Sequence, residues 1–259
     1  MSESYYTRIA ENVFRPAIHV QGAWREDEQH LAPVCGLLIH EMETHDPRPE
    51  LQLGKVTFDA LGVIGLDDST VEVRTLRPGR TIEQIEATLS VGDRPAVRAT
   101  GWRLAITDTA MVAGGERDPL PDPEGLPEWD GSSVWTGGFI ASLDMRTVQQ
   151  QMPGRGKVWV RPRYPLVEGE AAADIAAYLG AVDTANGIAT RVPPGEWMYP
   201  NVDLTVHLFR TPAAPWVGLD TRVTFGSTGL GLTSSTLHDV HGPVGRAEQS
   251  LTVRAVPPR

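Results

Sequence analysis

The stretch ATLSVGDRPAVRA at residues 87–99 returns without a gap as STLHDVHGPVGRA at residues 235–247. The offset between the copies (235 minus 87) is 148 residues, more than half of the 259-residue chain. Each copy holds two alternating segments around a turn that contains glycine and proline, a pattern typical of a β-hairpin. Upstream, residues 57–61 match residues 201–205 at an offset of 144. The repeat predicts a chain built from two related units.

Composition marks a boundary between these units at residues 107–136. This segment alternates acidic residues with four prolines: Pro119, Pro121, Pro123 and Pro127. Proline removes a backbone donor and fixes φ, so the segment is predicted to be an extended connector. We therefore predict an N-terminal unit at residues 1–106 without the site residues discussed below, the connector at residues 107–136, and a C-terminal unit at residues 137–259 that carries the site.

Hydrophobic periodicity predicts one helix and several strands in each unit. The first helix covers residues 33–44, and acidic residues at 26–28 precede it, where negative charge suits a helix N-terminus. The second covers residues 170–184, with 186–187 (Asn-Gly) as its C-terminal cap. Strands are predicted at residues 71–73, 82–89, 96–106, 139–147, 157–163, 202–208, 216–225, 230–239 and 244–256. The predicted fold class is α+β, a helix-on-sheet unit repeated in tandem.

The bulk composition limits the classes of function. With 41% hydrophobic and 22% charged residues, the chain is typical of a globular protein. Its net charge of −10 argues against nucleic acid and acidic membranes as partners. No apolar run approaches the ~18 residues of a membrane span, and the N-terminus lacks the features of a signal peptide. The single cysteine, Cys35, fits a reducing compartment, so a cytoplasmic protein is predicted, with no metal or redox cofactor.

Three polar residues of the second unit are placed where packing alone would favour apolar ones. Asp183 lies at the margin of the apolar stripe of the second helix, Asn201 opens the strand at 202–208, and Gln249 has the inward parity of the last strand. The corresponding positions of the first unit hold Thr57 for Asn201 and Gly101 for Gln249. The first unit therefore lacks the set.

A carboxylate with two amides can hold and deprotonate a water molecule, which is the chemistry of a general base. Each residue alone also has a structural explanation: Asp183 as a helix-end acid, Asn201 as a turn residue after Pro200, and Gln249 as a strand residue satisfied by the backbone. Because the set is complete in one unit and missing from the other, we favour a functional site.

Five segments carry a resemblance to a known family through their order and spacing. They are residues 21–24, 77–83, 179–187, 200–208 and 245–254. Together they resemble the double-hotdog acyl-CoA thioesterase superfamily, and within it the type II acyl-CoA thioesterases and an actinobacterial thioesterase-like branch. The resemblance implies a tandem hotdog fold, in which each unit wraps an antiparallel sheet on one central helix.

The resemblance also implies roles for the three polar residues. Type II thioesterases orient the attacking water with an Asp, a Thr and a Gln; Asp183 and Gln249 match the first and last, while Asn201 stands where that family has Thr. The implied function is hydrolysis of an acyl-CoA thioester to a carboxylic acid and CoA, with Asp183 as general base. By the same analogy, backbone N–H groups at a helix N-terminus would polarise the thioester oxygen.

Two alternative functions remain open at this stage. The departure at Asn201 favours a non-catalytic acyl-CoA or acyl-chain binding protein on the same fold. A scaffold protein without a ligand would instead have the space beside Asp183 filled, by Trp197, Tyr199 or Phe209. Acyl-CoA is the expected partner of both a thioesterase and a binding protein. The resemblance also implies a homo-oligomer.

Overall fold

One large sheet dominates the computed structural model, which describes residues 3–116 and 118–256. Twelve strands join it in the order β1-β2-β4-β5-β6-β3-β10-β13-β12-β11-β8-β7, and neighbouring strands run antiparallel. Their bounds are β1 (Tyr6–Ala10), β2 (Val13–Pro16), β3 (Leu51–Ala60), β4 (Ser69–Arg77), β5 (Ile82–Val91), β6 (Arg94–Ala105), β7 (Leu143–Thr147), β8 (Arg155–Pro162), β10 (Asp203–Leu208), β11 (Val217–Phe225), β12 (Leu230–Asp239) and β13 (Gly242–Thr252). A separate pair consists of β9 (Trp197–Met198) and β14 (Arg254–Ala255).

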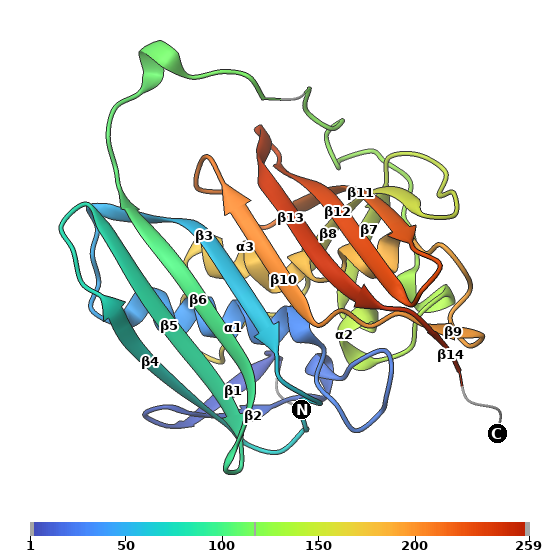
Figure 1. The fold of residues 1–259 in the computed structure, drawn as a ribbon, viewed down its shortest axis with the longest axis horizontal. Helices are drawn as coiled ribbons and strands as arrows, with labels where there is room; N and C mark the ends of the chain where they lie inside the picture. Colours follow the sequence, from blue (N-terminus) through green and yellow to red (C-terminus); the bar gives the residue numbers. More distant parts are fainter. Residues whose placement is uncertain (1–2, 117, 257–259) are drawn as a thin grey trace.

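The described helices are η1 (Ile18–Val20), α1 (Leu31–Thr44), η2 (Ala110–Val112), η3 (Gly131–Ser133), α2 (Gly138–Ala141), α3 (Asp174–Val182) and α4 (Ala185–Ile188). The two long helices, α1 and α3, lie on one face of the sheet (Figure 1). Figure 1 shows α1 and α3 side by side behind the strands, each behind its own half of the sheet. The predicted α+β class, with a helix-on-sheet unit repeated in tandem, is confirmed.

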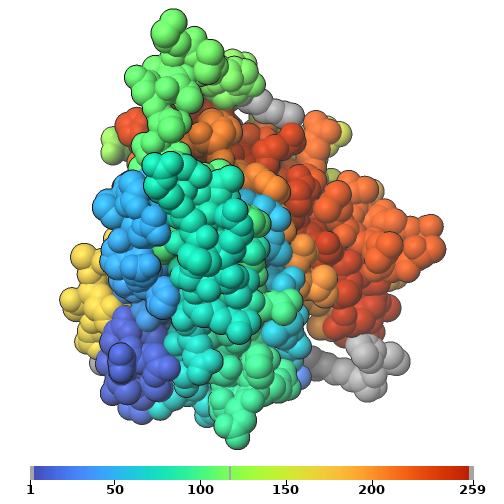
Figure 2. All heavy atoms as spheres, turned by 60° about the vertical axis from the view of Figure 1, so that its left-hand side comes forward, coloured from blue at the N-terminus to red at the C-terminus, as the bar shows by residue number. Residues whose placement is uncertain are grey.

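The repeated sequence forms the same hairpin twice. Strands β5 and β6 pair in the first half, and β12 and β13 pair in the second. Both hairpins shift register at the same point of the repeat, between Leu89 and Ser90 and between Leu237 and His238. The two halves then join through β3 and β10, whose inner edges would otherwise be open to a second chain. In Figure 2 the first half, in blue and green, lies directly beside the orange and red strands of the second.

Equivalent residues of the two halves meet each other at the centre of the molecule. Asp59 pairs with Asp203 across the β3–β10 junction. In the helical layer, a Cβ added to Gly36 would lie 3.0 Å from the Cα of Gly180. Both pairs are 144 residues apart, which is the offset between residues 57–61 and 201–205 of the sequence repeat. A residue that faces its own counterpart in this way marks an internal two-fold axis between the halves.

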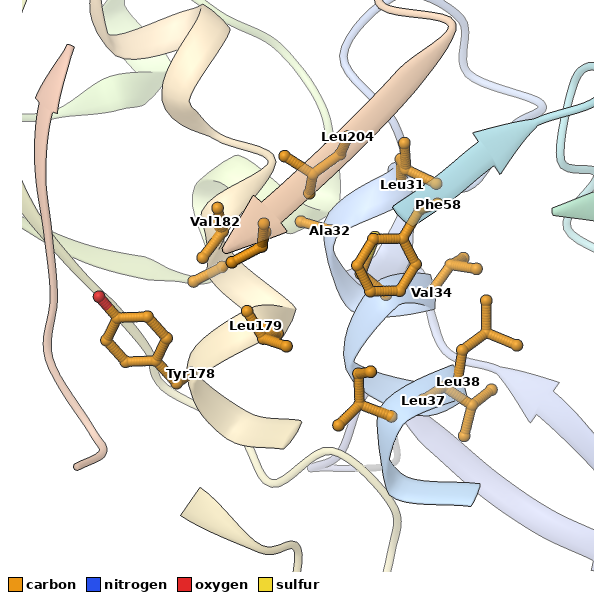
Figure 3. Packing of buried hydrophobic residues seen from close by; sticks show 14 of the residues in the cluster. Leu31, Ala32, Val34, Leu37, Leu38, Phe58, Tyr178, Leu179, Val182 and Leu204 are labelled. Carbon is orange, nitrogen blue, oxygen red and sulfur yellow. The ribbon is translucent and has the colours of Figure 1, made fainter. Parts of the chain in front are cut away.

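The main core fills the space between this pair of helices and the sheet. Figure 3 shows the side chains that gather there from α1, α3, β3 and β10, among them Leu37, Leu179, Phe58 and Leu204. All four are fully buried. Burial of each such side chain stabilises the fold by about 1.5–3 kcal/mol, and this packing fixes the positions of both helices relative to the sheet.

Three local expectations are corrected. The predicted strand at 139–147 begins only at Leu143, because residues 138–141 form α2. The start of α2 packs closely on η1: a Cβ on Gly138 would lie 2.0 Å from the backbone oxygen of Ile18. The second helix is shorter than predicted, and residues 186–187 lie inside α4 instead of capping it. Finally, α1 begins at Leu31 and is capped by His30, with no acidic residue in its first turn.

Between β6 and α2, the described residues 106–116 and 118–137 contain the 3₁₀ helices η2 and η3 but no strand of the large sheet. The proposed unit boundaries at residues 1–106, 107–136 and 137–259 stay predictions. No helix in residues 3–116 or 118–256 combines the length and the apolar character needed to cross a bilayer.

Candidate active site

The structure brings Asp183, Asn201 and Gln249 together from three elements. Asp183 is the residue directly after α3, Asn201 precedes β10, and Gln249 lies on β13. The amide nitrogens of Asn201 and Gln249 each donate a hydrogen bond of 2.8 Å to Asp183 Oδ1. Residues separated by 66 positions in the chain thus meet on one carboxylate oxygen.

The two amides leave the other carboxylate oxygen free. Within the described part of the chain, Oδ2 of Asp183 receives no hydrogen bond, and the nearest basic atom is Nδ1 of His30 at 3.6 Å. Asp183 lies in the wall of a cavity, so Oδ2 is the position at which a water molecule can be bound. The amides therefore orient the carboxylate, and the carboxylate in turn offers one oxygen to the cavity.

Burial changes the acidity of this group. The Asp183 side chain is only 4% exposed. Desolvation disfavours its charged form and raises its pKa to about 7, although the hydrogen bonds from Asn201 and Gln249 act in the opposite direction. A carboxyl that titrates near neutral pH is suited to accept a proton and to return it in one catalytic cycle.

His30 is a site residue that the sequence analysis missed. It belongs to the first half of the chain, as the N-cap of α1, where its Nδ1 accepts a hydrogen bond of 3.1 Å from the backbone N–H of Ala32. Burial lowers its pKa to about 4, so the imidazole is neutral. The only sequence signal for it is its position directly before the apolar run of the first helix.

The cavity beside Asp183 has a volume of about 420 Å³. Its apolar wall includes Trp24, Trp129, Trp135, Ile140 and Met145, and its polar wall includes His30, Asp183, Asn186 and Asn201. Trp24 packs edge-on against Trp135, with 4.9 Å between ring centroids. The space fits an apolar group whose end reaches the polar side chains.

The expectation of a filled site, which belonged to the scaffold alternative, is wrong. Two of the three aromatic residues suggested as fillers point elsewhere: Trp197 is 42% exposed and Phe209 is 60% exposed. The third, Tyr199, is fully buried and supports Trp24, with ring centroids 5.2 Å apart. The cavity therefore remains open next to the carboxylate.

The first half has no counterpart of this polar set. The two-fold equivalent of Asp183, 144 residues earlier, is Ile39, which is fully buried. Thr57 replaces Asn201 and bonds to Thr205 at 3.2 Å, and a Cβ on Gly101 would lie 2.9 Å from a methyl group of Leu53. The equivalent position is thus packed with apolar groups.

Several buried polar atoms near the site have no partner among residues 3–116 and 118–256. They include Oε1 of Gln249 and the hydroxyl of Thr233, its cross-strand neighbour, as well as Oδ1 of Asn186 in the cavity wall. Unpaired acceptors of this kind are sites for ordered water or for donors of a ligand. In the same residues no three His, Cys, Asp or Glu side chains are placed to hold a metal ion together.

Comparison with known families assigns both halves of the chain. The model for the acyl-CoA thioesterase N-terminal domain matches residues 20–104, and the model for the acyl-CoA thioesterase C-terminal domain matches residues 116–253. The second match alone covers more than half of the 259 residues. No curated protein matches the chain by sequence.

Solved structures agree with the fold. A hot dog fold protein of unknown function from Alicyclobacillus acidocaldarius has a TM-score of 0.77 at 12% identity, covering 98% of both chains. The acyl-CoA thioesterase II TesB2 from Mycobacterium marinum has a TM-score of 0.67 at 16% identity, covering 98% of this chain and 96% of the other. The tesB protein of Mycobacterium avium subs paratuberculosis gives 0.67 at 18%, with the same coverage. The tandem hotdog architecture is confirmed.

Proposed function

The chain belongs to the acyl-CoA thioesterase family, and from this premise we propose that Asp183, oriented by Asn201 and Gln249, holds the water that hydrolyses its acyl-CoA substrate. Thioesterase activity follows from the family. The proposal adds the residues that perform the reaction and the products, a carboxylic acid and free CoA. A cytoplasmic location and a homo-oligomer stay predictions.

In the proposed reaction, a water molecule donates a hydrogen bond to Oδ2 of ionised Asp183. Asp183 takes a proton from this water as its oxygen attacks the thioester carbonyl carbon, which gives a tetrahedral intermediate with a negatively charged oxygen. When the intermediate collapses, the C–S bond breaks, and the proton held by Asp183 passes to the departing CoA thiolate. The carboxylate is then restored for the next cycle.

Asn201 and Gln249 act on this reaction through Asp183. Their amide nitrogens both donate to Oδ1, so they fix the rotation of the carboxylate and keep Oδ2 directed to the cavity. The amide at position 201, where the type II thioesterases have Thr, keeps a donor on the carboxylate. This contact supports a catalytic reading of Asn201 over the binding-only alternative.

The observation that carries the proposal is that the two oxygens of one buried carboxylate have different surroundings. Oδ1 is held by two amides, and Oδ2 lies at the wall of an apolar cavity at 3.6 Å from His30. An acyl chain along Trp24, Trp135 and Ile140 would bring its thioester to this polar end. Positioning of the water and the carbonyl carbon in this way is the main task of such a site.

The test compares wild type with Asp183→Asn, which keeps the shape of the side chain and an oxygen for both amides. We expect thiol release from acyl-CoAs of short, medium and long chain length to fall by about 10²–10⁴ in kcat. The control is Asp59→Asn, which removes a half-buried carboxylate, paired with Arg98, at the β3–β10 junction and should leave the rate intact. A folded Asp183→Asn variant with the wild-type kcat would refute the assignment, and acyl-CoA binding without thiol release by wild type would favour the binding protein.

A further inference from the structure

His30 makes the site a joint product of the two halves of the chain. Its side chain lines the same cavity as Asp183, although the two residues come from opposite sides of the internal two-fold axis. The distance from Nδ1 to Asp183 Oδ2 is 3.6 Å, so the ring lies within reach of anything that the carboxylate binds. Neither the water nor the carboxylate needs a second acid or base, which leaves the function of this ring to be explained.

The hydrogen bond at Nδ1 determines which ring nitrogen carries the proton. The backbone N–H of Ala32 can only donate, so Nδ1, at 3.1 Å from that nitrogen, is the acceptor and carries no proton. In a neutral imidazole the hydrogen must then be on Nε2. Nε2 itself has no hydrogen-bond partner in the described residues. It is also not one of the buried unpaired atoms, so it is accessible to solvent. His30 thus presents an N–H donor to the cavity.

The donor is held rigidly. The N-cap bond fixes Nδ1, and the ring packs against Phe139 of α2, with 4.8 Å between centroids. The side chain is 13% exposed, and burial keeps the imidazole neutral near pH 7, because its pKa is lowered to about 4. A fixed dipole that needs no reorganisation is what stabilises charge as it develops on a reacting oxygen.

Capping alone does not explain a histidine at this position. The usual N-cap residues are Asn, Asp, Ser and Thr, which are small and accept the same backbone hydrogen bond. Any of them would satisfy Ala32 and leave the place of Nε2 empty. The Nε2 side of the ring is therefore not needed for the cap, and we assign it a function in the cavity.

We propose that His30 is a catalytic residue, whose Nε2–H donates a hydrogen bond to the thioester carbonyl oxygen. This assignment rests on the proposed hydrolysis at Asp183. As the water attacks and the C=O π pair moves to oxygen, the hydrogen bond from Nε2 strengthens; no proton is transferred to the oxygen. When the C–S bond breaks and the carbonyl re-forms, the hydrogen bond weakens again, and His30 is unchanged.

Two substitutions separate the two nitrogens. His30→Asn keeps an acceptor in the place of Nδ1 and so preserves the cap, but it has no group at Nε2. His30→Gln can place its amide nitrogen near the position of Nε2, but it loses the short-range cap. We expect kcat to fall about 10²–10³ in His30→Asn, the usual loss of one oxyanion donor, at an unchanged Tm. We expect His30→Gln to have a lower Tm and yet a higher kcat than His30→Asn.

Binding provides the second readout. A donor that acts on the transition state leaves affinity for the ground state almost unchanged, so the Kd of a non-hydrolysable thioether analogue of acyl-CoA should be equal in His30→Asn and wild type. His207→Asn, the same substitution on the exposed face of β10, is the control.

The outcomes distinguish this proposal from the one on which it rests. If Asp183→Asn is inactive while His30→Asn works at the wild-type rate, the role of His30 is wrong and the water site stands. Activity that simply follows Tm across the His30 variants overturns the catalytic role as well. If Asp183→Asn keeps its full rate, both proposals fail together.

Discussion

The carboxyl of Asp183 gives hydrolysis a pH dependence near neutral pH. Only the ionised form can accept a proton from water, and the pKa of this group is about 7. We therefore expect kcat/KM to rise about tenfold per pH unit below this value and to level off above it, since kcat/KM reports the groups of the free enzyme. Initial rates of thiol release across the pH range measure this directly. A flat profile through neutral pH is incompatible with Asp183 as the base.

The same group makes stability change with pH in the opposite sense. Because the folded-state pKa is raised above the ordinary 3.8, the folded protein binds more protons than the unfolded chain between that value and about 7. Stability is then greatest at the acidic end of this window and is lost as pH rises through it. Asp183→Asn removes the ionisable group, so it should be more stable than wild type at about pH 8, on the order of 2–4 kcal/mol at about 1.4 kcal/mol per pKa unit.

Urea unfolding of both proteins at about pH 8 and about pH 5 is the measurement. The advantage of Asp183→Asn should shrink as the pH is lowered. A variant that is less stable than wild type at the higher pH would show that the amide partners of Asp183, and not its desolvation, dominate.

The sequence predicts some features of the site and leaves others out of reach. Asp183 and Gln249 could be identified because helix and strand periodicity place them on inward faces, and because the first unit lacks them. Two amide nitrogens bind a single oxygen only at particular side-chain torsion angles, and sequence periodicity does not predict these angles. His30 could not be identified, because its partner is supplied by a helix of the other half.

At the scale of elements, the contact between α1 and α3 allows a matched pair of substitutions. A Cβ on Gly36 would meet two backbone atoms of α3, the Gly180 Cα at 3.0 Å and the Ala176 oxygen at 3.1 Å. A Cβ on Gly180 would find its nearest neighbour at 3.4 Å, an ordinary contact. Alanine stabilises a helix by about 1 kcal/mol over glycine, whereas overpacking costs about 1–3 kcal/mol.

We expect Gly180→Ala to be neutral or stabilising by up to about 1 kcal/mol, and Gly36→Ala to be destabilising by up to about 2 kcal/mol. Gly36→Ala should also lower kcat/KM, since α1 positions His30 and α3 positions Asp183. Chemical denaturation and thiol release on the two purified variants test the ranking. Equal free energies of unfolding for the two variants would mean that α1 and α3 can move apart without loss of stability.

Elements that depend on their own periodicity were easier to predict than those that depend on a distant neighbour. The strand predicted at 230–239 has the same bounds as β12, and the helix predicted at 33–44 differs from α1 only at its start. The strands β1 and β2, at one end of the sheet, were not predicted, because each is short and is held mainly by pairing. The second helix begins at Asp174, four residues after Glu170, whose side chain is bound by Arg8 and His40.

At the scale of the whole molecule, the two-fold arrangement with one polar site leads us to expect a single reaction centre per chain. Titration calorimetry with the thioether analogue of acyl-CoA should give one binding site per chain. The reverse experiment is Ile39→Asp, which places a carboxylate at the position equivalent to Asp183. Without amide partners there, the buried charge should cost about 3–5 kcal/mol in stability and add no activity. Two sites per chain, or a stable and faster variant, would contradict this expectation.

The symmetry about Gly36 and Gly180 has a consequence for inheritance. In a homodimer with the same symmetry, one codon specifies both members of every two-fold pair, so a mutation that suits one site is imposed on the other. When both copies are joined in one gene, each has its own codons and can drift separately. Ile39 can then stabilise the core on one side of the axis while Asp183 keeps its chemistry on the other. The gene of a homodimer cannot encode two different residues at equivalent positions.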